Sequence, residues 1–153
     1  MNDTQFEVDR DNLEVRITRV FNATPDKLWA AYTKPELIVK WWDNTEVDKN
    51  DLKVGGAWRY VSHGGDGSVH AFRGEFKEIE EPKKIVRTFE YEPMAGHVMT
   101  ETLNLEPVGD GKTKVTTISK FDNAQDLEGM VSMGMKEGSS AGLDRLATVV
   151  ENI

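Results

Sequence analysis

Residues 46–121 form a succession of short segments in which apolar and polar residues alternate, separated by turns rich in glycine and proline. Alternation with a period of two is typical of strands that bury one face only. Such strands are predicted at residues 57–62, 69–79, 85–92, 98–106 and 112–121. Because each segment follows the previous one across a short turn, we predict an antiparallel meander.

The segment before the meander predicts one more strand and two short helices. Apolar residues alternate from Leu13, which predicts a first strand. Thr24 is a suitable N-cap for a helix that begins at Pro25. Thr33 and Glu36 have the spacing of a capping box, so a second helix is expected to begin at Thr33.

A single long C-terminal helix is predicted after Asn123, where apolar residues recur at helical spacing. Gly134, Gly138 and Gly142 recur every fourth residue on this helix and would share one face. Each interior glycine costs about 1 kcal/mol relative to alanine, so the absent side chains must serve the tertiary structure. Three interpretations remain open: close packing or a kink, space for a ligand, or a break in the helix near Gly138.

The face of the sheet that meets this helix is expected to be the more apolar one, because side chains of a strand alternate between two faces. Aromatic residues and methionines dominate that face, and they suit either an ordinary core or an apolar pocket. The inward residues are predicted to be Trp58, Tyr60, Phe72, Phe76, Phe89, Tyr91, Met99, Leu103, Leu105, Val115 and Thr117.

Two charged residues, Arg87 and Glu101, fall within these inward rows on consecutive strands. A lone buried charge is very costly, whereas a hydrogen-bonded pair of opposite charges is tolerated. One interpretation is that a bulge or twist lets one of them reach solvent. The other is a cross-strand pair that anchors the carbonyl or carboxylate of a ligand.

Composition narrows the class of protein. The 153 residues suit one domain, predicted to span 13–153 after a loose lead-in at 1–12. The net charge of -8 and the dispersed basic residues argue against a nucleic-acid partner. No apolar run is long enough to cross a membrane, no secretory signal is recognisable, and cysteine is absent, so we expect a cytoplasmic protein without disulfides.

Signals for catalysis and for metal binding are weak. His63, His70 and His97 lack the spacing of metal ligands, and the glycine-rich turns lack the ending of a phosphate-binding loop. His70 and Glu101 could form an acid and base pair, but no nucleophile motif accompanies them. We therefore predict no catalytic residue, no cofactor and no metal.

Several segments resemble one protein family in their order and spacing. They are ITRVFNATPDKLWAAYTKPELIVKWW at 17–42, VGGAWRY at 54–60, RGEFKEIEEPKKIVRTFEY at 73–91 and GLDRLATVV at 142–150. The chain resembles the START-like, birch-pollen-allergen-like (SRPBCC) superfamily, and within it the family of the C-terminal domain of the activator of heat-shock protein 90 ATPase. The resemblance covers the chain from Leu13 to Asn152.

The resemblance implies an α+β helix-grip fold. In that fold a curved antiparallel sheet of about seven strands wraps around a long C-terminal helix, with two short helices after the first strand. It also implies a cavity between sheet and helix, but no shared catalytic residues. Members include ligand carriers, cyclase-like enzymes and co-chaperone domains, so the fold does not define the function.

We predict that the protein binds a small, mostly apolar or aromatic molecule in this cavity, without catalysis. The residues predicted to bind the molecule are Trp42, Trp58, Tyr60, Phe72, Phe76, Arg87, Phe89, Met99, Glu101, Thr117, Met130, Gly134 and Gly138.

Two alternatives stay open. The first is a cyclase- or hydrolase-like enzyme that uses Glu101 or His70 as a pocket acid or base. The second is a co-chaperone-like interaction module with an exposed apolar patch around Trp41 and Trp42. The large N-terminal domain of the chaperone activator is not found in this sequence, which argues against chaperone stimulation. A homodimer remains an open alternative.

Overall fold

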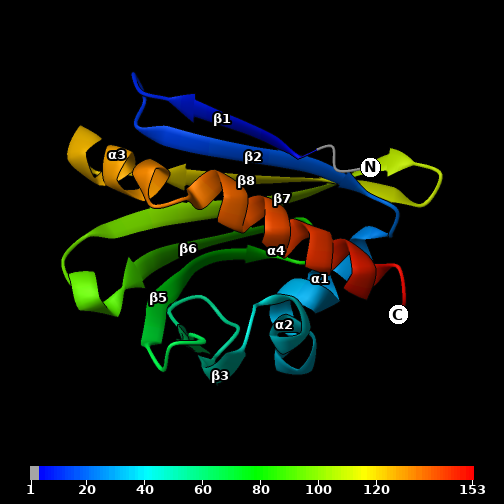
Figure 1. The fold of residues 1–153 in the computed structure, drawn as a ribbon. Coiled ribbons are helices and arrows are strands. Elements are labelled where there is room, and N and C mark those ends of the chain that lie inside the picture. Colours follow the sequence, from blue (N-terminus) through cyan, green and yellow to red (C-terminus); the bar gives the residue numbers. More distant parts are fainter. Residues whose placement is uncertain (1–3) are drawn as a thin grey trace.

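The computed structural model describes residues 4–153 as one antiparallel sheet curved around a helix (Figure 1). The strands in this part of the chain are β1 (Gln5–Asp9), β2 (Glu14–Phe21), β3 (Thr45–Asn50), β4 (Ala57–His63), β5 (Val69–Glu80), β6 (Lys84–Tyr91), β7 (Val98–Gly109) and β8 (Lys112–Lys120). The helices are α1 (Pro25–Thr33), α2 (Pro35–Trp41), the short 3-10 helix η1 (Glu92–Met94), α3 (Ala124–Ser132) and α4 (Met135–Val150).

The sheet order β1-β2-β8-β7-β6-β5-β4-β3 makes β3 to β8 a continuous meander, as predicted. Helix α4 lies across the concave face of the sheet, and α1 and α2 contact its C-terminal part (Figure 1). This arrangement is the helix-grip fold. It has eight strands in residues 4–153, where the resemblance implied about seven, because the lead-in also joins the sheet. Strand β3 was not among the strands predicted from alternation.

The N-terminal lead-in is more ordered than the sequence suggested. Gln5–Asp9 forms β1 and pairs with β2 from Gln5 opposite Thr18 to Asp9 opposite Glu14, so a loose segment is the wrong description here. The side chain of Asn12 and its backbone amide both donate to the carboxylate of Asp9, which closes the hairpin turn. Residues 1–3 of the predicted lead-in lie outside the described residues.

The two short helices form where expected, but the second does not begin with a capping box. Thr33 is the last residue of α1, and its hydroxyl donates to the Trp29 carbonyl at 2.7 Å. Lys34 is the N-cap of α2, and Pro35 occupies its first position. The proline therefore sets the start of α2, because it lacks the N–H group that a helix interior requires.

The C-terminal segment contains two helices, so the prediction of a single helix from Asn123 is wrong. Helix α3 ends at Ser132, and α4 begins at Met135. Gly134 between them has φ +87°, in the left-handed region that favours glycine. Helix α4 is continuous through Gly138 and Gly142. Its Leu146 and Val150 are fully buried in the core.

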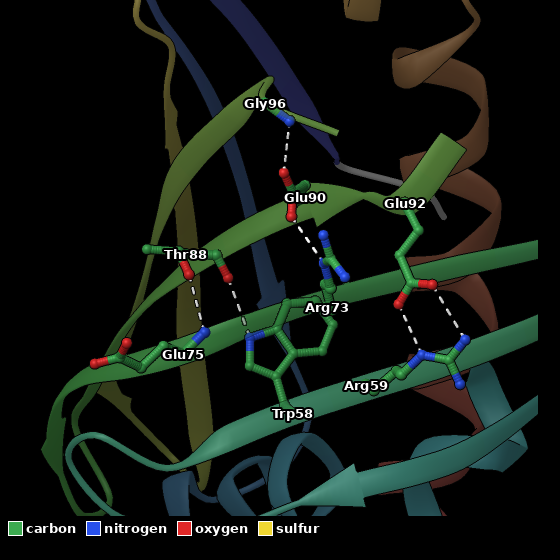
Figure 2. A network of polar contacts seen from close by, with 8 residues as sticks. All are labelled: Trp58, Arg59, Arg73, Glu75, Thr88, Glu90, Glu92 and Gly96. Carbon is green, nitrogen blue, oxygen red and sulfur yellow. Dashed lines mark hydrogen bonds and ion pairs between the residues drawn. The ribbon is translucent and has the colours of Figure 1, made fainter. Parts of the chain in front are cut away.

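A local gap in strand pairing allows Trp58 to cross from β4 to β6 (Figure 2). Trp58 lies opposite Gly74 of β5, which has no side chain to block the indole. The indole Nε1–H donates to the Thr88 carbonyl at 3.1 Å, and the Thr88 hydroxyl accepts from the Glu75 amide at 2.9 Å. Trp58 is 1% exposed, so its one polar atom must be paired, and Thr88 provides that pairing.

Ion pairs hold the connection from β6 to β7 against the neighbouring strands (Figure 2). Arg59 donates to both oxygens of Glu92, at 2.7 and 3.1 Å. Arg73 donates to one oxygen of Glu90 at 2.8 Å, and the other oxygen accepts from the Gly96 amide at 2.7 Å. The hydrogen bond from Gly96, followed by that from Arg73, lowers the pKa of Glu90 below its usual value.

We expect the Glu90→Gln variant to be less stable than wild type by about 1 kcal/mol at pH 7, because it loses charge-assisted hydrogen bonds. A carboxyl group whose folded pKa is lowered stabilises the protein above its unfolded pKa, near 4.3, and this contribution is lost as the pH falls through the folded pKa. Urea unfolding should therefore show a smaller difference in the free energy of unfolding between Glu90→Gln and wild type at pH 3 than at pH 7.

The exposed Glu78, which pairs with Lys84, provides the control for this experiment. The Glu78→Gln variant should differ little from wild type at either pH, because exposed pairs contribute little. If Glu90→Gln is less stable than wild type by the same amount at pH 3 as at pH 7, the loss of stability does not come from the carboxylate charge.

Candidate functional site

A cavity of about 300 Å³ lies between α4 and the concave face of the sheet. We call it the central cavity. Strands β5 to β8 form its floor, α4 covers it, and the end of α2 closes one side. Its lining residues are Ile17, Tyr32, Trp41, Trp42, Asp43, Phe76, Ile85, Arg87, Phe89, Met99, Glu101, Leu103, Thr117, Ser119, Met130, Met135, Gly138, Ser139, Gly142, Leu143 and Arg145.

Most of the residues predicted to bind a ligand lie together around this cavity. They are Trp42, Phe76, Arg87, Phe89, Met99, Glu101, Thr117, Met130 and Gly138. Trp58, Tyr60, Phe72 and Gly134 do not line it. Trp58 and Tyr60 form a second layer beneath Arg87. Phe72 packs between Trp42 and Phe89. Gly134 lies at the break between α3 and α4.

Other lining residues were not predicted from the sequence. Tyr32 comes from α1 and Ser119 from β8, while Arg145 reaches back from α4 and donates to the Trp41 carbonyl at 2.9 Å. The alternation of β8 contained a signal for Ser119, since it lies two residues after Thr117 on the same face. Nothing in the local sequence indicated that Tyr32 or Arg145 would face the cavity.

Arg87 and Glu101 form the cross-strand pair that the sequence allowed. They lie directly opposite each other on β6 and β7, and Arg87 Nε–H donates to Glu101 Oε1 at 2.8 Å. The exposed fractions of their side chains are 12% and 19%, so neither extends into solvent. Two opposite charges at this separation largely neutralise each other within the cavity wall.

Aromatic rings support the guanidinium of Arg87 from below. Its central carbon lies 4.0 Å from the ring centroid of Trp58 and 5.5 Å from that of Tyr60. Its Nη1 also donates to the Tyr60 hydroxyl at 3.3 Å. Burial alone would lower the pKa of Arg87, but Glu101 and Tyr60 together raise it, so the group stays charged.

Several polar atoms beside this pair make no hydrogen bond with any residue from 4 to 153. They are Arg87 Nη2, Glu101 Oε2 and the hydroxyl groups of Tyr32 and Ser119. No fully buried side-chain nitrogen or oxygen in the described chain lacks a partner, so these atoms face accessible space. Because their residues line the central cavity, that space is the cavity.

Burial raises the pKa of Tyr32 well above its usual value, and the nearby Glu101 carboxylate raises it further. The hydroxyl therefore keeps its proton at neutral pH and is available as a hydrogen-bond donor toward the cavity.

The glycines of α4 leave open space instead of packing closely against the sheet. A Cβ atom added at Gly138 would meet no heavy atom within 4 Å, and one added at Gly142 would meet only Arg145 Nη2, at 3.9 Å. Gly138 is exposed and also lines the cavity, so the cavity opens to solvent beside it. The close-packing interpretation is therefore wrong for these two glycines.

A second pocket of about 310 Å³ adjoins the central cavity beneath α3. Phe89, Met99 and Met130 line both spaces and so form their common wall. At the outer rim His97 Nδ1 lies 2.7 Å from Asp126 Oδ1, which connects α3 to the loop before β7. Methionine side chains adapt readily to different neighbours, so this wall is deformable.

The acid and base pair of His70 and Glu101 is not assembled. His70 lies 3.1 Å from the Ser68 hydroxyl and 2.6 Å from the Tyr91 hydroxyl, and it does not line the central cavity. Glu101 is paired with Arg87 instead. Within residues 4–153 no three histidine, aspartate or glutamate side chains gather as a metal site.

Trp41 and Trp42 do not form the exposed apolar patch that was expected if the protein were an interaction module. Trp41 is 9% exposed, and its indole donates to the Ala31 carbonyl at 2.9 Å. Trp42 packs its ring against Tyr60 and Phe72 on the cavity side. No helix in the described chain is long and apolar enough to cross a membrane.

A family model described as "Activator of Hsp90 ATPase homolog 1-like protein" matches residues 22–151. The chain belongs to this family. The match confirms the resemblance to the SRPBCC superfamily, whose fold commonly binds ligands in a cavity. A search of curated proteins finds no match.

Solved structures similar to this family member share its fold over nearly the whole chain. Protein Ms6760 from Mycobacterium smegmatis is 25% identical with a TM-score of 0.87, and the alignment covers 96% of each chain. A protein from Arthrobacter aurescens is also 25% identical with a TM-score of 0.88, covering 97% of this chain and 92% of the other. A protein from Rhodobacter sphaeroides is 21% identical with a TM-score of 0.87, covering 99% of both.

Proposed function

We propose that this protein binds a small, mostly apolar or aromatic molecule in the central cavity and does not act on it chemically. The observation that carries the proposal is a space of about 300 Å³, lined mainly by apolar side chains, with one compensated ion pair in its wall. Cavities of this size with a few convergent polar groups are typical of small-molecule sites.

The open glycines of α4 give independent support. A glycine inside a helix costs about 1 kcal/mol relative to alanine, and at Gly138 no neighbouring atom requires the absence of a side chain. Because Gly138 lines the central cavity, the absent side chain leaves room there for a bound molecule. The enzyme alternative has less support, because the polar groups of the cavity include no assembled acid and base pair.

Binding is tested with N-phenyl-1-naphthylamine, a neutral apolar probe whose fluorescence rises in apolar surroundings. We expect saturable binding at one molecule per chain, and we expect native mass spectrometry of gently purified protein to show a co-purifying small molecule. A crystal structure in which side chains fill the central cavity, together with absence of probe binding, would refute the proposal.

A larger side chain at Gly138 of α4 should change ligand binding and stability in opposite directions. We expect Gly138→Leu to raise the free energy of unfolding by about 1 kcal/mol through helix propensity, and to weaken binding of the probe by about tenfold or more because leucine occupies the opening. Urea unfolding and fluorescence titration measure the two effects.

Gly129→Leu is the matched control. Gly129 is inside α3, also has no heavy atom within 4 Å of an added Cβ, and lines the second pocket instead of the central cavity. It should gain similar stability and keep its affinity for the probe. If both variants bind the probe as wild type does, the central cavity is not the binding site.

A further inference from the structure

The unpaired atoms around Arg87 and Glu101 define which polar group a bound molecule can carry. Arg87 Nη2 and the Tyr32 hydroxyl supply donors, and Glu101 Oε2 supplies an acceptor. A ligand group that uses both kinds of partner accepts one hydrogen bond and donates another. The amide group has this arrangement, since its carbonyl accepts and its N–H donates.

The net charge of this wall further restricts the ligand. Arg87 and Glu101 compensate each other at 2.8 Å, so this wall carries no net charge to balance an ionised ligand. The other charged lining residues, Asp43 and Arg145, have opposite charges and are exposed to solvent. A ligand carboxylate would add a second negative charge beside Glu101 in a site mostly lined by apolar atoms. The cost of burying an uncompensated charge is larger than the gain from one more hydrogen bond.

We infer that the central cavity selects a neutral amide or lactam attached to an apolar or aromatic body, and rejects the corresponding carboxylate. This inference rests on the proposed function and assigns the chemical class of its ligand. The amide oxygen accepts from Arg87 Nη2 or the Tyr32 hydroxyl, and the amide N–H donates to Glu101 Oε2. The apolar body lies against Phe76, Phe89 and Met99.

A matched pair of probes tests the inference. 1-Naphthaleneacetamide and 1-naphthaleneacetate share one aromatic body and differ at pH 7 in the charge of the polar group. Isothermal titration calorimetry should show that the wild-type protein binds the amide about tenfold or more tightly than the carboxylate, a difference of about 1.4 kcal/mol.

The Glu101→Gln variant should reverse this preference. It leaves the Arg87 guanidinium without its carboxylate, so the naphthaleneacetate anion becomes the better partner. Glu128→Gln removes the same charge from the exposed pair with Arg10, away from the cavity, and should keep the preference of wild type. Tyr32→Phe tests the site without disturbing the ion pair, and should weaken binding of the amide by about threefold to tenfold.

The outcomes separate the inference from the proposed function. If wild type binds both probes equally, or the carboxylate more tightly, the neutral-amide inference is overturned while binding in the cavity stands. If Tyr32→Phe and a folded Glu101→Gln variant both keep the wild-type affinities, the polar wall is not the anchor and the inference is again overturned. If wild type binds neither naphthalene probe nor N-phenyl-1-naphthylamine, the proposed function itself fails.

Discussion

Replacing Gly74 with alanine is expected to destabilise the protein by about 4 kcal/mol or more. A Cβ atom at this position would lie 1.9 Å from the Thr88 carbonyl oxygen and 2.5 Å from the indole nitrogen of Trp58. The first of these atoms belongs to the backbone of β6 and has no freedom to rotate away. Strand β5 and strand β6 would have to separate, and the indole would lose its hydrogen bond to Thr88 (Figure 2).

Thermal and urea unfolding of Gly74→Ala measure the effect, with Gly65→Ala as control. Gly65 lies in the turn between β4 and β5, has no atom within 4 Å of an added Cβ and requires no positive φ, so its substitution should change stability by less than about 0.5 kcal/mol. Adding Trp58→Phe to Gly74→Ala should not restore stability, because the contact with the Thr88 carbonyl remains. A Gly74→Ala variant as stable as wild type would show that the strands can separate at little cost.

Removing one member of the cavity ion pair is expected to have the second largest effect. Glu101→Leu should lower the free energy of unfolding by about 3 kcal/mol, because it leaves the buried Arg87 guanidinium without a carboxylate. The Tyr60 hydroxyl remains as its one hydrogen-bond acceptor among residues 4–153, with the Trp58 and Tyr60 rings beside it. The expected loss is at the low end for a buried pair, since both side chains keep some exposure. Urea unfolding at pH 7 measures the loss.

The double variant Arg87→Met/Glu101→Leu should recover most of that loss. Two apolar side chains in place of a buried pair are often neutral for stability, because both desolvation costs disappear together. A double-mutant cycle measures the coupling between the two positions. The exposed pair of Arg10 and Glu128 is the control and should show no measurable coupling. Additive effects at Arg87 and Glu101 would show that the pair is not a unit.

The three glycines of the C-terminal segment show what the sequence alone could not predict. Their spacing placed Gly134, Gly138 and Gly142 on one helical face, but it could not distinguish a kink from a cavity. In the structure the three glycines differ. Gly134 adopts a left-handed conformation between α3 and α4, whereas Gly138 and Gly142 lie within α4 and face open space. Backbone conformation at a glycine depends on the packing of both flanking helices, which no local pattern contains.

Trp58 and Tyr60 show a similar limit. Alternation correctly predicted that both side chains point to the concave face, and both are buried. The place of Trp58 beneath Arg87, instead of at the cavity surface, depends on the absence of a side chain at Gly74 on the adjacent strand and on the gap beside Thr88. Such an arrangement joins three strands, so it follows from strand register and not from the sequence of any one strand.

The sequence by itself determined most elements of this protein: the antiparallel meander, the two short helices before it, the inward rows and the possibility of an Arg87–Glu101 pair. These depend on periodicity and turn chemistry, which are local. Only the tertiary structure decided that the pair forms, that Tyr32 and Ser119 line the cavity with it, and that α4 leaves a cavity of about 300 Å³ above the sheet. A cavity is the volume that no side chain occupies, and its existence depends on how distant segments approach one another.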